Sequence, residues 1–104
     1  MKIFLAGHKG LVGSAILRKL KQKNFKNIIT ADRKKLDLLN QKKVYDFLKR
    51  HKPNIVIIAA AKVGGVLNNS RHGADFIYEN LQIQNNLIHG SYLAGVKNLL
   101  LLGP

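Results

Sequence analysis

Short apolar runs alternate with amphipathic segments along the whole chain. The apolar runs have the length of β-strands and occupy residues 2–6, 27–31, 55–61 and 99–102. Between them, apolar residues recur at helical spacing, which predicts a helix of about three turns from Leu11 and further helices over 41–51 and 73–94. The order β-α-β-α-β-α-β favours parallel strands joined by right-handed crossovers.

The third apolar run is the clearest strand, because residues 55–61 contain no polar side chain and begin with β-branched residues. Such a run is typical of a parallel strand covered on both faces. We therefore predict a Rossmann-like, doubly wound α/β domain over residues 1–104, with strand order 3-2-1-4 and helices on both faces. Because such a sheet usually continues past its fourth strand, we expect this chain to be the N-terminal portion of the domain.

A glycine-rich segment joins the first predicted strand to the first predicted helix, with the spacing G-x-x-G-x-x-G. In dinucleotide-binding folds, such glycines permit a tight turn, the approach of a pyrophosphate to the backbone, and close packing of the helix. The N–H groups at the helix start then face the phosphates. A glycine-rich turn without a ligand is the structural alternative. The predicted pyrophosphate-binding residues are Gly7, His8, Lys9, Gly10, Leu11, Val12 and Gly13.

The residues after the second strand leave the choice of dinucleotide open. Asp32 stands where a carboxylate would bind a ribose 2′-hydroxyl and favour NAD. Arg33 follows it, and Lys9 lies in the glycine loop, where cationic groups would favour the 2′-phosphate of NADP. Lys34 and Lys35 are interpreted as solvated loop charges.

Two further features can contact a cofactor or serve the fold alone. Asp37 can accept a hydrogen bond from an adenine amino group, or it can cap the following helix. The alanines at 59–61 can make room where a cofactor crosses the strand ends, or they can allow tight packing against a helix. The sequence pattern does not decide between these interpretations.

The composition adds a strong positive charge and excludes cysteine chemistry. The chain has 18 Lys and Arg against 5 Asp and Glu, a formal net charge of +13. The lysines are spread along the chain, as on solvated helix faces, although a basic chain can also favour acidic partners. The absence of cysteine excludes disulfides and thiolate chemistry. The four histidines lack metal-ligand spacing, so we predict no metal site. No apolar run approaches the ~18 residues of a membrane span, and we expect a cytoplasmic protein.

Three segments go beyond a generic dinucleotide fold. They are residues 6–16 (Ala-Gly-His-Lys-Gly-Leu-Val-Gly-Ser-Ala-Ile), 59–65 (Ala-Ala-Ala-Lys-Val-Gly-Gly) and 74–81 (Ala-Asp-Phe-Ile-Tyr-Glu-Asn-Leu). Together they resemble the GDP-L-fucose synthase family of extended short-chain dehydrogenases/reductases. The resemblance implies an enzyme that epimerises two carbons beside the ketone of GDP-4-keto-6-deoxymannose and then reduces the ketone with NADPH.

The resemblance also implies cofactor contacts outside the glycine loop. Asp32 departs from the neutral or polar residue expected at its position in the family, which leaves NAD possible beside NADP. The implied contacts are Lys9 and Arg33 at the 2′-phosphate, Asp37 and Leu38 at the adenine, and Ala60 and Ala61 at the nicotinamide side.

The catalytic residues of that family are not found in this sequence. In the family, the strand matching 99–102 leads to a Gly-Ser-Ser-Cys segment and a later Tyr-x-x-x-Lys pair, whereas here Gly103 is followed by Pro104. We therefore expect a cofactor-binding part that has no catalytic residue and is inactive alone, with a nucleotide-sugar substrate only in a complete enzyme. Tyr78 and Tyr92 lie on an apolar helix face, and we expect them to pack in the core.

The helix predicted over 73–94 carries apolar residues on two sides. One stripe comprises Ala74, Ile77, Tyr78, Leu81, Ile88 and Tyr92, and the other comprises Phe76, Ile83, Leu87 and Ala94. Because one stripe suffices to cover a sheet, the second should meet another helix. The resemblance implies that this helix forms a homodimer interface, and a further helix of the same subunit is the alternative.

A rival function is a binding module, in which a degenerate dinucleotide fold presents its basic surface to nucleic acid or another acidic partner. The net charge and the missing catalytic residues favour this interpretation. The intact glycine triplet favours cofactor binding, which we prefer to a nucleic-acid partner.

Overall fold

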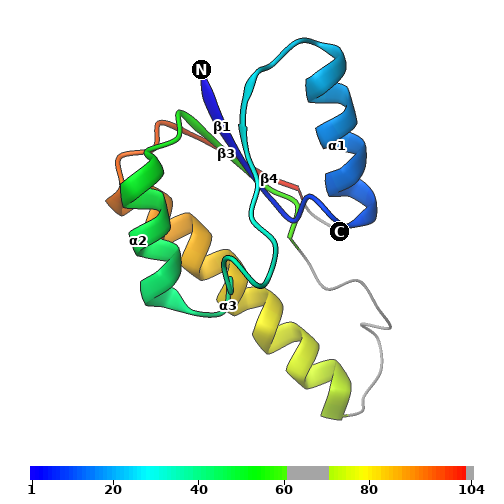
Figure 1. The fold of residues 1–104 in the computed structure, drawn as a ribbon. Helices are drawn as coiled ribbons and strands as arrows, with labels where there is room; N and C mark the ends of the chain where they lie inside the picture. Colours follow the sequence, from blue (N-terminus) through cyan, green and yellow to red (C-terminus); the bar gives the residue numbers. More distant parts are fainter. Residues whose placement is uncertain (61–70, 103–104) are drawn as a thin grey trace.

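The computed structural model describes residues 1–60 and 71–102, with side chains in the last helix described from residue 74. In that part of the chain the elements are β1 (Lys2–Ala6), α1 (Leu11–Gln22), β2 (Asn27–Ile29), α2 (Gln41–His51), β3 (Ile55–Ile58), α3 (Arg71–Leu93) and β4 (Asn98–Leu101). The strands form one parallel sheet, with α1 on one face and with α2 and α3 on the other (Figure 1). This arrangement confirms the predicted Rossmann-like architecture.

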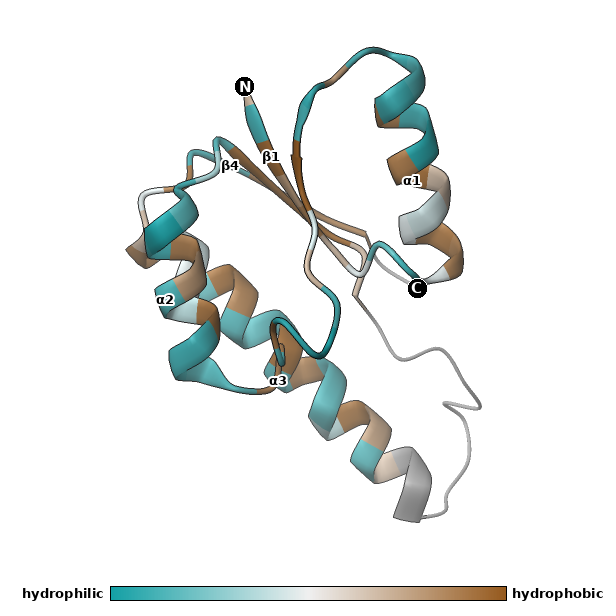
Figure 2. Ribbon diagram, viewed as in Figure 1, coloured by the Kyte–Doolittle hydropathy of each residue, from teal (hydrophilic) through white to brown (hydrophobic). Residues whose placement is uncertain are grey.

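Alternate residues of β1 divide the core into two layers. Phe4 belongs to a buried cluster that includes Val44 of α2 and Leu87 of α3. Ile3 and Leu5 belong to a second cluster, which packs against the apolar side of α1. Apolar residues accordingly concentrate in the sheet, while the C-terminal turns of α1 and the outer side of α2 are largely polar (Figure 2). Coverage on both faces is what a parallel strand with no polar residue between Ile3 and Ala6 requires.

The predicted strand order 3-2-1-4 is wrong. The observed order is β2-β1-β3-β4, so β3 pairs with β1, with Phe4 opposite Val56. The buried residues of β3 need a neighbouring strand on each side, whereas β2 has three residues, none of them buried, and suits an edge. The chain therefore runs from β1 outward to β2 and returns past β1 to β3. In doubly wound sheets, such a reversal of strand order leaves a crevice at the carboxyl ends of the strands.

The bounds of α2 and α3 can be related to the residues at their ends. α2 has the predicted bounds, and its N-cap is Asn40, whose side chain accepts a hydrogen bond from the backbone N–H of Lys43 at 3.1 Å. Asp37 is therefore not the cap of this helix. α3 spans residues 71–93 instead of 73–94, and Gly95 follows it in a left-handed conformation, with φ of 79°. The strands predicted over 27–31 and 55–61 end earlier, at Ile29 and Ile58.

α3 has the two apolar faces that the sequence predicts. Ile83 and Leu87 are buried against the sheet and α2. The expectation that Tyr78 and Tyr92 pack in the core is wrong, because they are 68% and 76% exposed. Bands of apolar residues recur along the whole described length of the helix (Figure 2). The large exposed residues of the outer face are Ile77, Tyr78, Leu81, Ile88 and Tyr92.

Candidate dinucleotide-binding site

Gly7 and Gly13 are required by the packing of the protein itself. Gly7 follows β1 with φ of 90°, and a Cβ there would lie 2.6 Å from the backbone of Ala60. A Cβ at Gly13 would overlap the carbonyl oxygen of Gly7. The first turn of α1 therefore packs directly on the turn that leaves β1, and only glycine fits at these two positions.

Gly10 has no such internal requirement. Its φ of −72° is open to any residue, and within residues 1–60 and 71–102 a Cβ would meet only the carbonyl oxygen of Gly7, at an ordinary contact distance of 3.6 Å. Gly10 is the N-cap of α1, and as a glycine it has no side chain that could cap the helix. The first turn of α1 also contains no acidic residue. The first N–H groups of a helix lack intrahelical partners, so this end of α1 is suited to an anion.

A cleft of about 610 Å³ opens beside this loop, at the carboxyl ends of β1 and β3. Its size falls within the range of about 300–1,000 Å³ that is usual for small-molecule sites. We call it the glycine-loop cleft. Its lining residues come from the loop, the segment after β2, the end of β3 and α3, and they are Gly7, His8, Lys9, Gly10, Ala31, Asp32, Arg33, Lys34, Leu36, Asp37, Leu38, Leu39, Ala59, Ala60 and Ile83.

Asp32 is held by a turn of its own loop and lies near one cation, Lys9. Its Oδ1 accepts a hydrogen bond from the backbone N–H of Lys35 at 3.0 Å, and its Oδ2 lies 3.7 Å from Nζ of Lys9. The hydrogen bond from the Lys35 N–H, with a smaller contribution from the Lys9 ammonium, lowers the pKa of Asp32 below its usual value. Asp32 is therefore a carboxylate at neutral pH, with one oxygen already used by the turn.

The segment after β2 forms a second wall of the cleft without regular secondary structure. Leu36 is buried in the core beneath it. Oδ1 of Asp37 accepts a hydrogen bond from the backbone N–H of Leu39 at 3.0 Å, so the Asp37 carboxylate stabilises the turn of its own loop. The carbonyl oxygen of Leu38 accepts a hydrogen bond from Nδ2 of Asn86 at 2.8 Å.

Most of the predicted site residues lie around this one cleft. Those that line it are Gly7, His8, Lys9, Gly10, Arg33, Asp37, Leu38 and Ala60. Leu11 and Val12 are exposed at the start of α1 and, like the buried Gly13, do not line the cleft, while Ala61 lies outside the described residues. The prediction missed Leu36 and Leu39, whose apolar character beside Asp37 was a usable signal. It also missed Ile83, which lies on α3 and reaches the cleft only through tertiary packing of elements far apart in the sequence.

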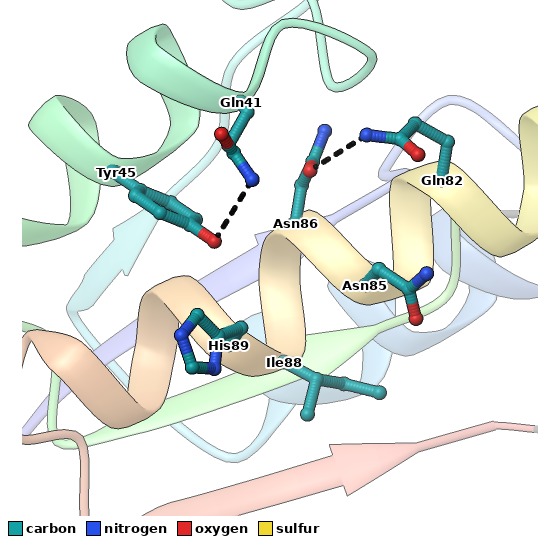
Figure 3. Close-up of a pocket in the computed structure, with 7 residues that line it drawn as sticks. All are labelled: Gln41, Tyr45, Gln82, Asn85, Asn86, Ile88 and His89. Carbon is teal, nitrogen blue, oxygen red and sulfur yellow. Dashed lines mark hydrogen bonds between the residues drawn. The ribbon is translucent and has the colours of Figure 1, made fainter.

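A second, more open cleft of about 370 Å³ lies between α2 and α3. Figure 3 shows the amide side chains that dominate its lining, with Gln41 donating to Tyr45 Oη and Gln82 donating to Asn86 Oδ1. Within the described residues, no group of three or more His, Cys, Asp or Glu side chains could hold a metal ion. None of the described helices is long and apolar enough to cross a membrane.

The fold and the glycine-loop cleft define a Rossmann-like α/β domain. The sequence model of the NAD dependent epimerase/dehydratase family matches residues 3–103, and the chain belongs to this family. It is similar to GDP-L-fucose synthase 1 of Arabidopsis thaliana, with 55% identity over 98% of this chain and 32% of that protein. Its identity to the GDP-L-fucose synthase of Escherichia coli strain K12 is 43%, over 98% of this chain and 32% of that protein.

Among solved structures, the chain is similar to the NADP-bound GDP-mannoheptose C4 reductase of Campylobacter jejuni. The TM-score is 0.89 and the identity 46%, over 98% of this chain and 32% of that one. The chain thus spans about a third of the length of the relatives that it matches.

Proposed function

We propose that residues 1–104 are the NADP-binding part of a GDP-L-fucose synthase-like epimerase/reductase. The observation that carries this proposal is the space around Gly10, where a Cβ would meet no atom of the described residues except the Gly7 carbonyl oxygen, at 3.6 Å. That space lies at the uncapped start of α1 and borders the glycine-loop cleft. A pyrophosphate there would accept hydrogen bonds from the first N–H groups of the helix.

The charges around the cleft favour NADP over NAD. Lys9 and Arg33 line the cleft and supply two cations for a 2′-phosphate. Asp32, which would favour NAD, is engaged by the Lys35 N–H and lies close to Lys9. A ribose 2′-hydroxyl would have to compete with these partners, whereas a 2′-phosphate would replace Asp32 as the counter-ion of Lys9.

The substrate of the complete protein would be a GDP-linked keto sugar, as the names of the relatives indicate. Residues 1–104 would bind the cofactor, but they would not provide the proton donor for reduction of the ketone. In support, none of the tyrosines in the part of the chain that the structure describes lines the glycine-loop cleft. We therefore expect this chain to bind cofactor and to show no reductase activity alone.

The outer face of α3 would join two copies of the chain as a homodimer. Its exposed apolar residues recur at helical spacing, with Leu81 53% and Tyr92 76% exposed. Apolar stripes of this kind are typical of helix-bundle interfaces.

Calorimetric titration of the purified chain with NADPH and with NADH tests the cofactor. We expect tighter binding of NADPH, and we expect Arg33→Ala to weaken NADPH by about tenfold while leaving NADH nearly unchanged, since a charged hydrogen bond contributes about 1.5–3 kcal/mol. Arg18→Ala, which removes the same charge from an exposed position of α1 outside the cleft, is the matched control. If the chain bound neither dinucleotide, the proposal would be refuted. A preference for NADH would indicate that Asp32 binds the ribose 2′-hydroxyl.

A further inference from the structure

Asn86 is a polar side chain buried in the layer between α2, α3 and the cleft. It is 1% exposed, on the side of α3 that carries the buried Ile83 and Leu87. Packing alone does not explain an amide there, because an apolar residue of similar size would fill the same space without loss of hydration.

Both ends of the Asn86 carboxamide are used. Nδ2 donates to the carbonyl oxygen of Leu38 at 2.8 Å, across 48 positions of sequence, and Oδ1 accepts from Nε2 of Gln82 at 3.2 Å. Figure 3 shows this second bond, which ties the amide to the preceding turn of α3 and fixes its orientation. A buried side chain that is hydrogen-bonded at both its donor and its acceptor end favours one arrangement of its surroundings.

The group that Asn86 holds is part of the wall of the glycine-loop cleft. Leu38 lies between Asp37 and Leu39, and all three line that cleft. The loop has its own internal turn, in which Asp37 accepts from the N–H of Leu39, and Leu36 anchors it to the core. Among the described hydrogen bonds of this loop, the bond to Asn86 is the one that reaches α3, and it adds a directional contact to the apolar packing of Leu38 and Leu39 on the core.

We propose that Asn86 is a positioning residue for the adenine end of the cofactor. It fixes the Leu38 backbone so that the adjacent carboxylate of Asp37, which lines the cleft, is placed to accept a hydrogen bond from the purine 6-amino group. This inference rests on the proposed function, and it adds a residue on α3 that controls recognition of the base without contacting the cofactor.

The test compares NADPH with its hypoxanthine analogue, in which an oxygen replaces the 6-amino group. We expect the parent chain to bind NADPH about tenfold more tightly than the analogue, because the analogue loses a donor to a carboxylate. Asn86→Asp removes the Nδ2 donor and places a second acceptor beside the Leu38 carbonyl. Asn86→Ser removes the same donor without adding a charge. In both variants the ratio of the two dissociation constants should fall close to one.

The matched control is Asn85→Asp, the same change at the adjacent, exposed position. It should keep the parent ratio. A general loss of structure would weaken both ligands together, so a change in the ratio separates positioning from folding. An unchanged ratio in folded Asn86 variants would overturn the inference, as would equal binding of the two ligands by the parent. Loss of the far-ultraviolet circular dichroism signal in both variants would show that the contact serves the fold instead. Failure of the parent to bind NADPH would instead refute the proposed function.

Discussion

The substitution Gly10→Ala separates the needs of a ligand from the needs of the fold. The backbone at Gly10 has φ of −72° and ψ of 173°, an extended conformation that alanine adopts without strain. The added Cβ would lie 3.6 Å from the carbonyl oxygen of Gly7 and would clash with nothing in the described protein. The expected loss of stability is the lower preference of alanine for the N-cap, about 0.5–1 kcal/mol.

The expected effect on binding is larger. The Cβ would occupy the space by which a pyrophosphate approaches the first turn of α1, and would hold it away from the N–H donors. Loss of one hydrogen bond to a charged group weakens binding by about 1.5–3 kcal/mol, which raises the dissociation constant about tenfold or more. Titration of the variant with NADPH measures this change, and thermal unfolding measures the stability.

Gly90→Ala should have the opposite effect, a loss of stability without a loss of affinity for NADPH. A Cβ at Gly90 would lie 2.8 Å from Cδ1 of Tyr45 and 3.0 Å from Cδ1 of Leu48, in the contact between α3 and α2 and outside the glycine-loop cleft. This variant should lose stability through overpacking, by about 1–3 kcal/mol, and should keep its affinity for NADPH under conditions where it is folded. If Gly10→Ala binds NADPH as the parent does, the argument from the empty space at Gly10 is wrong.

Two further predictions concern α3. Leu81→Lys should convert a dimeric chain into a monomer by light scattering, because it places a charge in the exposed apolar face, while Ala15→Lys on the exposed side of α1 should not; a monomeric parent would contradict the dimer. Ser91→Ala should raise the free energy of unfolding by about 1 kcal/mol in urea denaturation, because its buried Oγ has no hydrogen-bond partner among the described residues. Ser14→Ala, which loses an exposed bond to the Leu11 carbonyl, is the comparison, and a lower midpoint for Ser91→Ala would reveal a partner for that hydroxyl.

The sequence predicted the elements and the glycine loop because both depend on neighbouring residues. The alternation of apolar runs located every strand and helix, and the bounds of α2 agree residue for residue. The spacing from Gly7 to Gly13 located the turn between β1 and α1, where packing requires glycine at both ends.

The strand order and the far wall of the cleft could not be predicted in this way. Periodicity shows how deeply a segment is buried but not which strand it pairs with, so the β1–β3 pairing was missed. Ile83 and Asn86 reach the cleft wall from α3, more than 40 residues from Leu38, through tertiary packing alone. The exposure of Tyr78 and Tyr92 was predicted wrongly for a related reason. The pattern shows that a helix face is apolar, but it does not show whether another element covers that face.

The close packing of Gly13 on Gly7, and of Gly7 on Ala60, restricts the shape of the loop through the fold itself. A binding loop that must become ordered loses conformational entropy on association, and that loss weakens the affinity. Here the fold itself supplies much of that order, because main-chain atoms of the loop pack closely on one another and on Ala60. Association should therefore be fast, and the affinity should depend on the contacts made with the phosphates and not on a rearrangement of the protein.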